Sequence, residues 1–183
     1  PSPLVPRKIV AFTFTERAAA ELKERIGARG PAQHGELPGM AEMYVGTIHG
    51  FCLDLLRAEV PTLLKYAVLN EVQQTLFVDR YAQKCGLTSS SDLNGKALER
   101  YKDTGRYIDA LDLLRQAELN EAALAQCSVR QGLDQYRQLL QEKCYFDYTA
   151  IMDHAVRALQ QDADLRARLA ARVRHVIVDE YQD

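Results

Sequence analysis

The sequence predicts an α/β fold in which a parallel sheet is interrupted by a helical insertion. Short β-branched and aromatic runs at 8–14, 43–47 and 176–178 predict strands, and a segment with helical periodicity follows each of the first two. Strands that alternate with helices are typical of a parallel sheet, because parallel neighbours need a crossover connection. Residues 62–145 show helical patterns and no convincing strand, so we expect them to be inserted between two parts of the sheet.

The composition is typical of a soluble globular protein. The chain has 183 residues, of which 47% are hydrophobic and 26% are charged. No apolar run approaches the roughly 20 residues of a membrane span, which excludes an integral membrane protein. The net charge of −2 argues against a protein that coats nucleic acid, but not against a local binding groove. The four cysteines form no CxxC pair and fit a reducing, cytoplasmic location.

The first predicted strand leads into a helix. Thr15 is expected to cap this helix over residues 16–26, because a threonine hydroxyl can accept from a free backbone N–H of the first turn. Gly27 is expected to end it. The glycine- and proline-rich residues 27–39 then predict a loop.

Helical signals continue through the rest of the chain. A second helix is expected over 48–58, ending before Pro61. Asp147 is expected to cap an amphipathic helix that follows it. Further helices are predicted over 70–84, 106–117, 129–143 and 163–172. The chain therefore divides into 1–61 as the first part of the α/β domain, 62–145 as the insertion and 146–183 as the return to that domain.

Acidic residues follow the third predicted strand. The apolar run 176–178 is typical of a strand buried on both faces of a parallel sheet, and the ends of such strands are where open α/β sheets bind ligands. Asp179 can hold Mg²⁺, Glu180 can orient and deprotonate an attacking water, and the amide of Gln182 can sense a terminal phosphate. The alternative is a strand followed by an ordinary acidic turn.

Two strand-to-helix junctions carry groups suited to nucleic acid. At the first, Phe14 can stack on a base, and Thr15 with the helix N-terminus can bind phosphate. At the second, Thr47 and His49 can donate hydrogen bonds to phosphate, and Phe51 can stack.

Each junction also has a purely structural interpretation, with Thr15 as a plain cap, Phe14 in the core and His49 as a structural residue. If the strands are parallel, however, Thr15, His49 and Glu180 emerge at one edge of the sheet. That placement favours a nucleotide and nucleic-acid site.

These residues resemble motifs of the UvrD/Rep/PcrA-like superfamily 1 DNA helicases. The string TFTERAAAELKERI at 13–26 resembles motif Ia, GTIHGFC at 46–52 resembles motif Ib, and VDEYQD at 178–183 resembles motif II, the Walker B element. Phe146-Asp147-Tyr148 resembles the segment upstream of motif II. The block between motifs Ib and II matches the family's inserted subdomain 1B, so the similarity spans nearly the whole chain.

The resemblance implies part of a RecA-like motor domain that uses ATP and Mg²⁺ to move 3′→5′ on single-stranded DNA and to unwind duplex at a junction. It implies protein partners in DNA repair or recombination, and no membrane. By motif position, Asp179 and Glu180 would serve the metal, Glu180 would be the catalytic base, and Gln182 would couple the γ-phosphate to movement. The residues along the single-strand path would be Phe14, Thr15, Thr47, His49 and Phe51.

Two departures from the family pattern leave alternatives open. Gly50 stands where many UvrD-like members have Ser, and the string TIHGFC also resembles the RecB/AddA helicase–nuclease branch. No GxxxxGK string followed by Ser or Thr occurs in the 183 residues, so the chain is expected to be a piece of a motor that is inactive by itself. A non-catalytic module that only binds single-stranded DNA is the third alternative.

Overall fold

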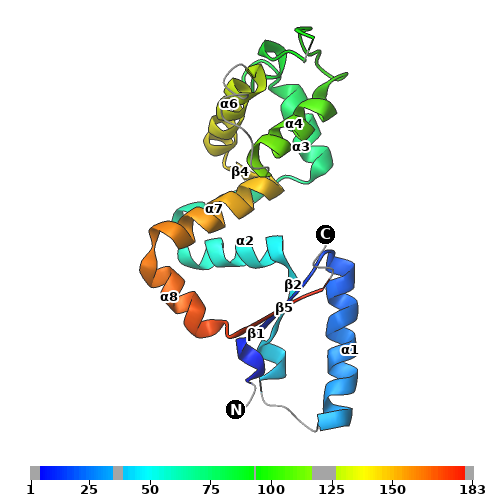
Figure 1. Cartoon of the computed structure of the whole chain (residues 1–183), viewed down its shortest axis with the longest axis vertical. Coiled ribbons are helices and arrows are strands. Elements are labelled where there is room, and N and C mark those ends of the chain that lie inside the picture. The colour runs from blue at the N-terminus through cyan, green and yellow to red at the C-terminus, as the bar shows by residue number, and fades with distance from the viewer. Residues whose placement is uncertain (1–4, 35–38, 93, 117–126, 180–183) are drawn as a thin grey trace. The chain divides into compact units, whose positions relative to one another are not determined.

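The computed structural model describes residues 5–34, 39–92, 94–116 and 127–179 (Figure 1). The chain divides into two compact units, one formed by Pro1–Pro61 with His154–Asp183 and the other by Thr62–Asp153. The second boundary falls inside helix α7 (Tyr148–Gln161). None of the helices among the described residues is long and apolar enough to cross a membrane.

The first unit is an α/β unit with a three-stranded parallel sheet, which confirms the predicted fold class. The strands β1 (Ile9–Thr13), β2 (Tyr44–Thr47) and β5 (His175–Val178) lie in the order β2-β1-β5. Both pairings are parallel, with Thr13 opposite Thr47 and Phe12 opposite Val178.

Helices cover both faces of this sheet. Figure 1 shows α1 on one side of the strands and α2 and α8 on the other. Their bounds are α1 (Glu16–His34), α2 (Ile48–Glu59) and α8 (Ala163–Arg172), and short 3₁₀ turns occupy Pro6–Lys8, Met40–Glu42 and Pro61–Leu63. The helices bury apolar side chains against the strands. The buried hydrophobic residues of this unit are Val10, Ala11, Ala19, Val45, Leu55, Leu56, Ala155 and Leu165.

Helix α1 is longer than the sequence predicts. We expected Gly27 to end it, but the helix continues to His34. A glycine ends a helix by adopting a left-handed conformation. Here Gly39 has the positive φ, of 85°, and Gly27 does not. Gly30 also makes a close tertiary contact, because a Cβ there would lie 2.6 Å from the Met40 Cε atom, so this part of the helix packs against the following segment.

The prediction that β5 is buried on both faces is wrong. Val176, Ile177 and Val178 are 56%, 56% and 45% exposed. Among the described residues β5 pairs with β1 alone, so it forms an edge of the sheet. An apolar run has the same pattern in a central strand and in an edge strand, and its neighbours decide how much of it is buried.

The second unit is mainly helical. Its helices are α3 (Glu71–Arg80), α4 (Thr104–Gln116), α6 (Ser128–Lys143) and the start of α7, with a 3₁₀ turn at Leu87–Ser89. Tyr107, Leu111 and Tyr136 are fully buried at its centre. The expectation of no strand in 62–145 is wrong in one detail. Strands β3 (Ala67–Val68) and β4 (Tyr145–Phe146) form a parallel pair, and two residues are too short to show a strand periodicity.

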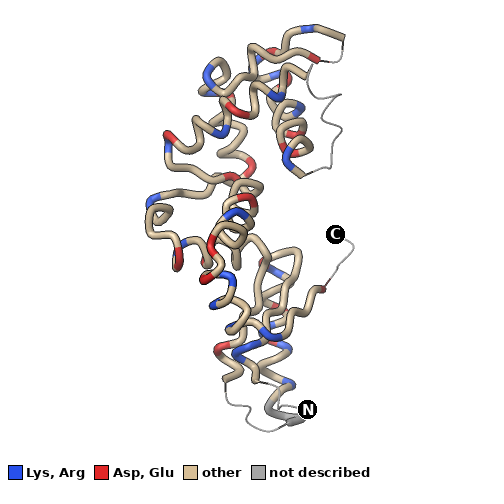
Figure 2. Tube along the Cα trace, turned by 60° about the vertical axis from the view of Figure 1, so that its left-hand side comes forward, with Lys and Arg blue, Asp and Glu red and all other residues tan. Residues whose placement is uncertain are grey.

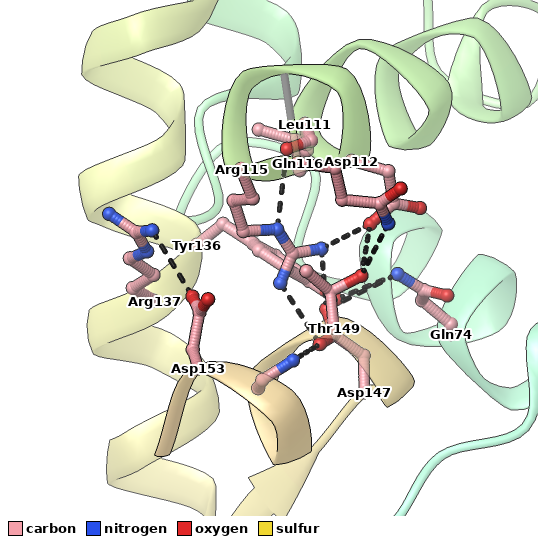
Figure 3. Close-up of polar contacts among 11 residues, drawn as sticks. Gln74, Leu111, Asp112, Arg115, Gln116, Tyr136, Arg137, Asp147, Thr149 and Asp153 are labelled. Carbon is pink, nitrogen blue, oxygen red and sulfur yellow. Dashed lines mark hydrogen bonds and ion pairs between the residues drawn. The ribbon is translucent and has the colours of Figure 1, made fainter. Parts of the chain in front are cut away.

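A buried polar network holds the first turn of α7 in this unit (Figure 3). The Asp147 carboxylate accepts from the backbone N–H of Ala150 at 2.7 Å, which confirms the predicted cap. It also accepts from Arg115 Nη1 at 2.9 Å, from Tyr136 Oη at 2.8 Å and from Gln74 Nε2 at 3.4 Å. These partners come from α4, α6 and α3, so one carboxylate joins four helices.

Candidate functional site

The carboxyl ends of the three parallel strands meet at one edge of the sheet. Thr13 ends β1 opposite Thr47, which ends β2. The backbone N–H of Asp179 donates to the Phe12 carbonyl at 2.9 Å, which places Asp179 just past the end of β5 at the same edge. The structure thus brings together the two junctions and the start of the acidic segment that the sequence singled out.

Asp179 is the last described residue, and Glu180 and Gln182 lie outside the described residues. The side chain of Asp179 is exposed at the sheet edge. Within the described part of the chain, no group of three or more His, Cys, Asp or Glu could hold a metal ion. Mg²⁺ commonly takes one or two carboxylates and completes its shell with phosphate oxygens and water. A role of Asp179 in holding Mg²⁺ stays a prediction.

The first junction combines a helix cap with an exposed aromatic ring. Thr15 Oγ1 accepts from the backbone N–H of Ala18 at 3.1 Å, which confirms it as the cap of α1. The Thr13 hydroxyl donates to the Thr15 carbonyl at 3.0 Å, which closes the turn. Phe14 is 66% exposed between these two threonines, so the interpretation of Phe14 as a core residue is wrong. Its ring is open to a stacking partner.

The second junction is held by the Thr47 hydroxyl. This oxygen accepts from the backbone N–H of Gly50 at 3.1 Å, so Thr47 caps α2. The same hydroxyl donates to Glu16 Oε1 at 2.8 Å. Thr47 is only 8% exposed. Both hydrogen-bonding functions of its hydroxyl are therefore used within the protein, which argues for Thr47 shaping the junction.

His49 lies in the first turn of α2 and is half-buried. Burial lowers the pKa of His49 below its ordinary value of 6.5. The imidazole is therefore mainly neutral at pH 7 in the chain without a ligand.

Phe51 belongs to an aromatic cluster beneath the second junction. Its ring centroid lies 5.4 Å from that of Phe12 and 5.0 Å from that of Tyr44, and both pairs are edge-to-face. Phe12 and Tyr44 also pack edge-to-face at 6.2 Å. Such pairs stabilise a core beyond the area they bury. A base-stacking role for Phe51 stays a prediction.

Two glycines at the second junction accommodate the ring of Tyr44. A Cβ at Gly46 would lie 2.7 Å from the Tyr44 hydroxyl oxygen, and a Cβ at Gly50 would lie 3.1 Å from it. That hydroxyl donates to the Thr47 carbonyl at 3.0 Å. Burial, with smaller contributions from the charges of Asp54, Glu16 and Cys52, raises the pKa of Tyr44 to about 12. Tyr44 is therefore a protonated donor at neutral pH.

Sequence reasoning missed Glu16 and Tyr44. An acidic residue in the first turn of a helix is common, because it interacts favourably with the helix dipole, so Glu16 carried no distinctive pattern. Tyr44 fitted the expected strand. The register of β1 against β2 brings Glu16 to Thr47, and such a register is not readable from either strand by itself. Tyr44 reaches the Thr47 carbonyl from within β2, three residues away.

Charged residues of both signs occur throughout the described parts of each unit. Figure 2 shows Lys and Arg interspersed with Asp and Glu along the trace of each unit. This distribution agrees with the net charge of −2.

Comparison with known proteins identifies relatives over the whole chain. A family model described as the UvrD/REP helicase N-terminal domain matches residues 3–183, which confirms the resemblance drawn from the three motifs. The chain is 27% identical to the ATP-dependent DNA helicase UvrD1 of Mycobacterium leprae, over 96% of this chain and 22% of that protein. It is 22% identical to the ATP-dependent DNA helicase Rep of Buchnera aphidicola, over 97% of this chain and 26% of that protein.

A shorter match is more similar. Over 54 residues, which are 29% of this chain and 6% of the relative, the chain is 48% identical to DNA helicase II of Escherichia coli. The chain spans about a quarter of the length of the two relatives that it matches nearly throughout.

Proposed function

The chain belongs to the UvrD/REP helicase N-terminal domain family, and from this premise we propose that it forms part of the ATP-driven motor of a DNA helicase. The motor would move 3′→5′ on single-stranded DNA and open duplex at a junction. One observation carries the proposal at the level of the structure. Three features lie at one edge of a parallel sheet: the exposed ring of Phe14, the junction of Thr47 and His49, and the carboxylate of Asp179.

We assign the nucleotide chemistry to the acidic segment. Asp179 would hold Mg²⁺ that arrives with ATP, and this ion would supply charge neutralisation of the phosphates. Glu180 would orient a water molecule and accept its proton. Gln182 would hydrogen-bond to the terminal phosphate and so couple release of that phosphate to movement of the motor. Burying these groups in a closed motor would strengthen each electrostatic contact.

We assign the single-strand path to the two junctions. Phe14 would stack on a base, a contact worth about 1–3 kcal/mol. The first turns of α1 and α2, capped by Thr15 and Thr47, would offer backbone N–H groups to phosphates. His49 would add a hydrogen bond to phosphate, and Phe51 would border the path.

The 183 residues contain no GxxxxGK string followed by Ser or Thr. A triphosphate needs the backbone N–H groups and the lysine that such a loop provides. These residues expressed alone are therefore proposed to hydrolyse no ATP and to unwind no DNA. We place the full-length protein in the cytoplasm, in DNA repair or recombination. The four cysteines, Cys52, Cys85, Cys127 and Cys144, are all free thiols, which fits a reducing compartment.

The direction of movement provides the first test. Single-stranded DNA carrying a fluorophore at its 3′ end or at its 5′ end is mixed with the full-length protein and ATP in a stopped-flow instrument. The proposal predicts that protein accumulates at the 5′ end, after a lag that grows with DNA length. Accumulation at the 3′ end, or no length-dependent lag at either end, would contradict it.

A further inference from the structure

One hydrogen bond joins the two junctions that we assign to the DNA path. Thr47 Oγ1 donates to Glu16 Oε1 at 2.8 Å across 31 positions of sequence. Glu16 is the first residue of α1, directly after Phe14 and Thr15, and Thr47 is the residue that caps α2. The bond therefore runs from the start of one helix to the cap of the other.

The partner groups leave the Thr47 hydroxyl little freedom to rotate. Its oxygen accepts from the Gly50 N–H at 3.1 Å, so its hydrogen is directed elsewhere, and Glu16 provides the acceptor. The Thr47 carbonyl is held as well, by the Tyr44 hydroxyl at 3.0 Å. The turn before His49 is thus held by its side chain and by its main chain.

Among the described hydrogen bonds, Thr47 is the one residue of the second junction that bonds to the Glu16 side chain. The Glu16 carboxylate also lies close to Gly50: a Cβ at Gly50 would be 3.7 Å from Glu16 Oε1. If the Glu16 acceptor is removed, the Thr47 hydroxyl keeps its cap but loses its link to α1. The β1–β2 pairing still holds the strand ends together, but the first turn of α1 is then no longer joined to the Thr47 side chain.

We propose that Glu16 is a positioning residue that fixes the Thr47–His49 turn against the Phe14–Thr15 turn, so that both engage one single strand of DNA together. This inference rests on the proposed function, because it needs the two turns to contact DNA. Groups held in place before binding lose less entropy when the ligand arrives. Glu16 contributes through the acceptor oxygen that it offers to Thr47. Its negative charge by itself opposes phosphate binding.

Acceptor and charge can be separated by two substitutions in the full-length protein. Glu16→Gln keeps an acceptor oxygen and loses the charge, whereas Glu16→Ala loses both. The measurement is the dissociation constant for fluorescein-labelled oligothymidylate, by anisotropy at fixed salt, because salt strongly affects such affinities. Glu24→Ala on the exposed face of α1 is the matched control. Thermal unfolding of each variant verifies that it is folded.

We expect Glu16→Ala to raise the dissociation constant by up to about tenfold, because the Thr47–His49 turn must then be ordered when DNA binds. Glu16→Gln should restore affinity to the original value or above it. Thr47→Val should weaken binding similarly, and the Glu16→Ala/Thr47→Val double variant should be no weaker than Thr47→Val alone, because both changes break the same link.

Phe14→Ala separates this inference from the proposed function. If Phe14→Ala weakens binding but Glu16→Ala does not, or if Glu16→Ala strengthens it, the positioning role is overturned and the DNA path stands. If neither Phe14→Ala nor Thr47→Val affects binding, the proposed DNA path is wrong, and the role of Glu16 is overturned with it.

Discussion

Arg115 and Asp147 form an ion pair in which the two side chains are 1% and 2% exposed, with Arg115 Nη2 at 2.9 Å from Asp147 Oδ2 (Figure 3). The residues are 32 positions apart. Arg115 also contacts Asp112 at 2.5 Å, so the buried cation has two acidic partners. Asp147 also caps α7, so one carboxylate both pairs with Arg115 and accepts from the first turn of that helix.

Removing Arg115 should strongly destabilise the chain. Arg115→Ala leaves Asp147 buried without its cation, and breaking a buried pair in this way costs about 3–5 kcal/mol. Urea unfolding followed by circular dichroism measures the free energy of unfolding. Arg137→Ala is the control, because its pair with Asp153 is 3.4 Å long and both side chains are substantially exposed, so its loss should cost about 0–1 kcal/mol. If the two variants lost the same free energy of unfolding, the buried pair would contribute no more to stability than the exposed pair does.

Gly50 should resist substitution because of Tyr44. Alanine in a helix is normally more stable than glycine by about 1 kcal/mol, but a Cβ at Gly50 would lie 3.1 Å from the Tyr44 hydroxyl and 3.2 Å from Thr47 Oγ1. We therefore expect Gly50→Ala to lower the free energy of unfolding by about 1 kcal/mol.

The same substitution should be neutral or stabilising in a Tyr44→Phe background, where the hydroxyl is gone. Thermal unfolding of the four proteins in this double-mutant cycle gives the coupling. Strict additivity of the two substitutions would contradict the proposed contact between Gly50 and Tyr44.

Stability should fall steeply at alkaline pH. A tyrosine in an unfolded chain ionises at about pH 10. Burial raises the pKa of Tyr44 to about 12, and burial also raises the pKa of Tyr107 and of Tyr136. Their contribution is complete below pH 10 and is lost as the pH rises toward the folded-state values, because only the unfolded chain releases these protons.

The thermal midpoint measured between pH 8 and pH 12 should therefore drop above pH 10, together with the rise in phenolate absorbance. Tyr44→Phe should reduce the slope of this drop. An unchanged slope would mean that Tyr44 titrates normally in the folded chain.

Phe14 should matter for DNA and little for stability. Phe14→Ala is expected to weaken oligothymidylate binding by about 1–3 kcal/mol, the loss of one base stack. Because the ring is 66% exposed, the thermal midpoint should change by only a degree or two. Phe14→Tyr keeps the π-face and serves as the matched variant. Loss of affinity in both variants would argue against stacking.

The sequence predicted the elements with clear local signals. The predicted helix 163–172 agrees with α8, which Asp162 caps by accepting from the backbone N–H of Leu165 at 2.8 Å. The apolar run 176–178 lies within β5. The capping box of α3 is another local device, with Gln73 N–H donating to Asn70 Oδ1 at 2.9 Å. Such features involve residues only three apart, and a sequence pattern records them directly.

Features that depend on distant partners were not predicted. The cation for Asp147 comes from Arg115 on another helix, and the acceptor for Thr47 comes from Glu16 after another strand. The exposure of β5 depends on its neighbours in the sheet, and the part of α1 beyond Gly27 packs against Met40 at Gly30. In the candidate site, the motifs therefore located both junctions, but not the contacts that join them.

ATP hydrolysis by a Glu180→Gln variant of the full-length protein tests the central claim most directly. The amide can still hydrogen-bond to water but cannot accept its proton, whereas Asp179 remains available for Mg²⁺. Glu24→Gln, on the exposed face of α1, is the control for loss of a carboxylate. We predict that Glu180→Gln binds ATP and single-stranded DNA but loses DNA-stimulated hydrolysis by about a hundredfold or more, while Glu24→Gln behaves as the original protein. Near-normal DNA-stimulated hydrolysis by Glu180→Gln would contradict the account.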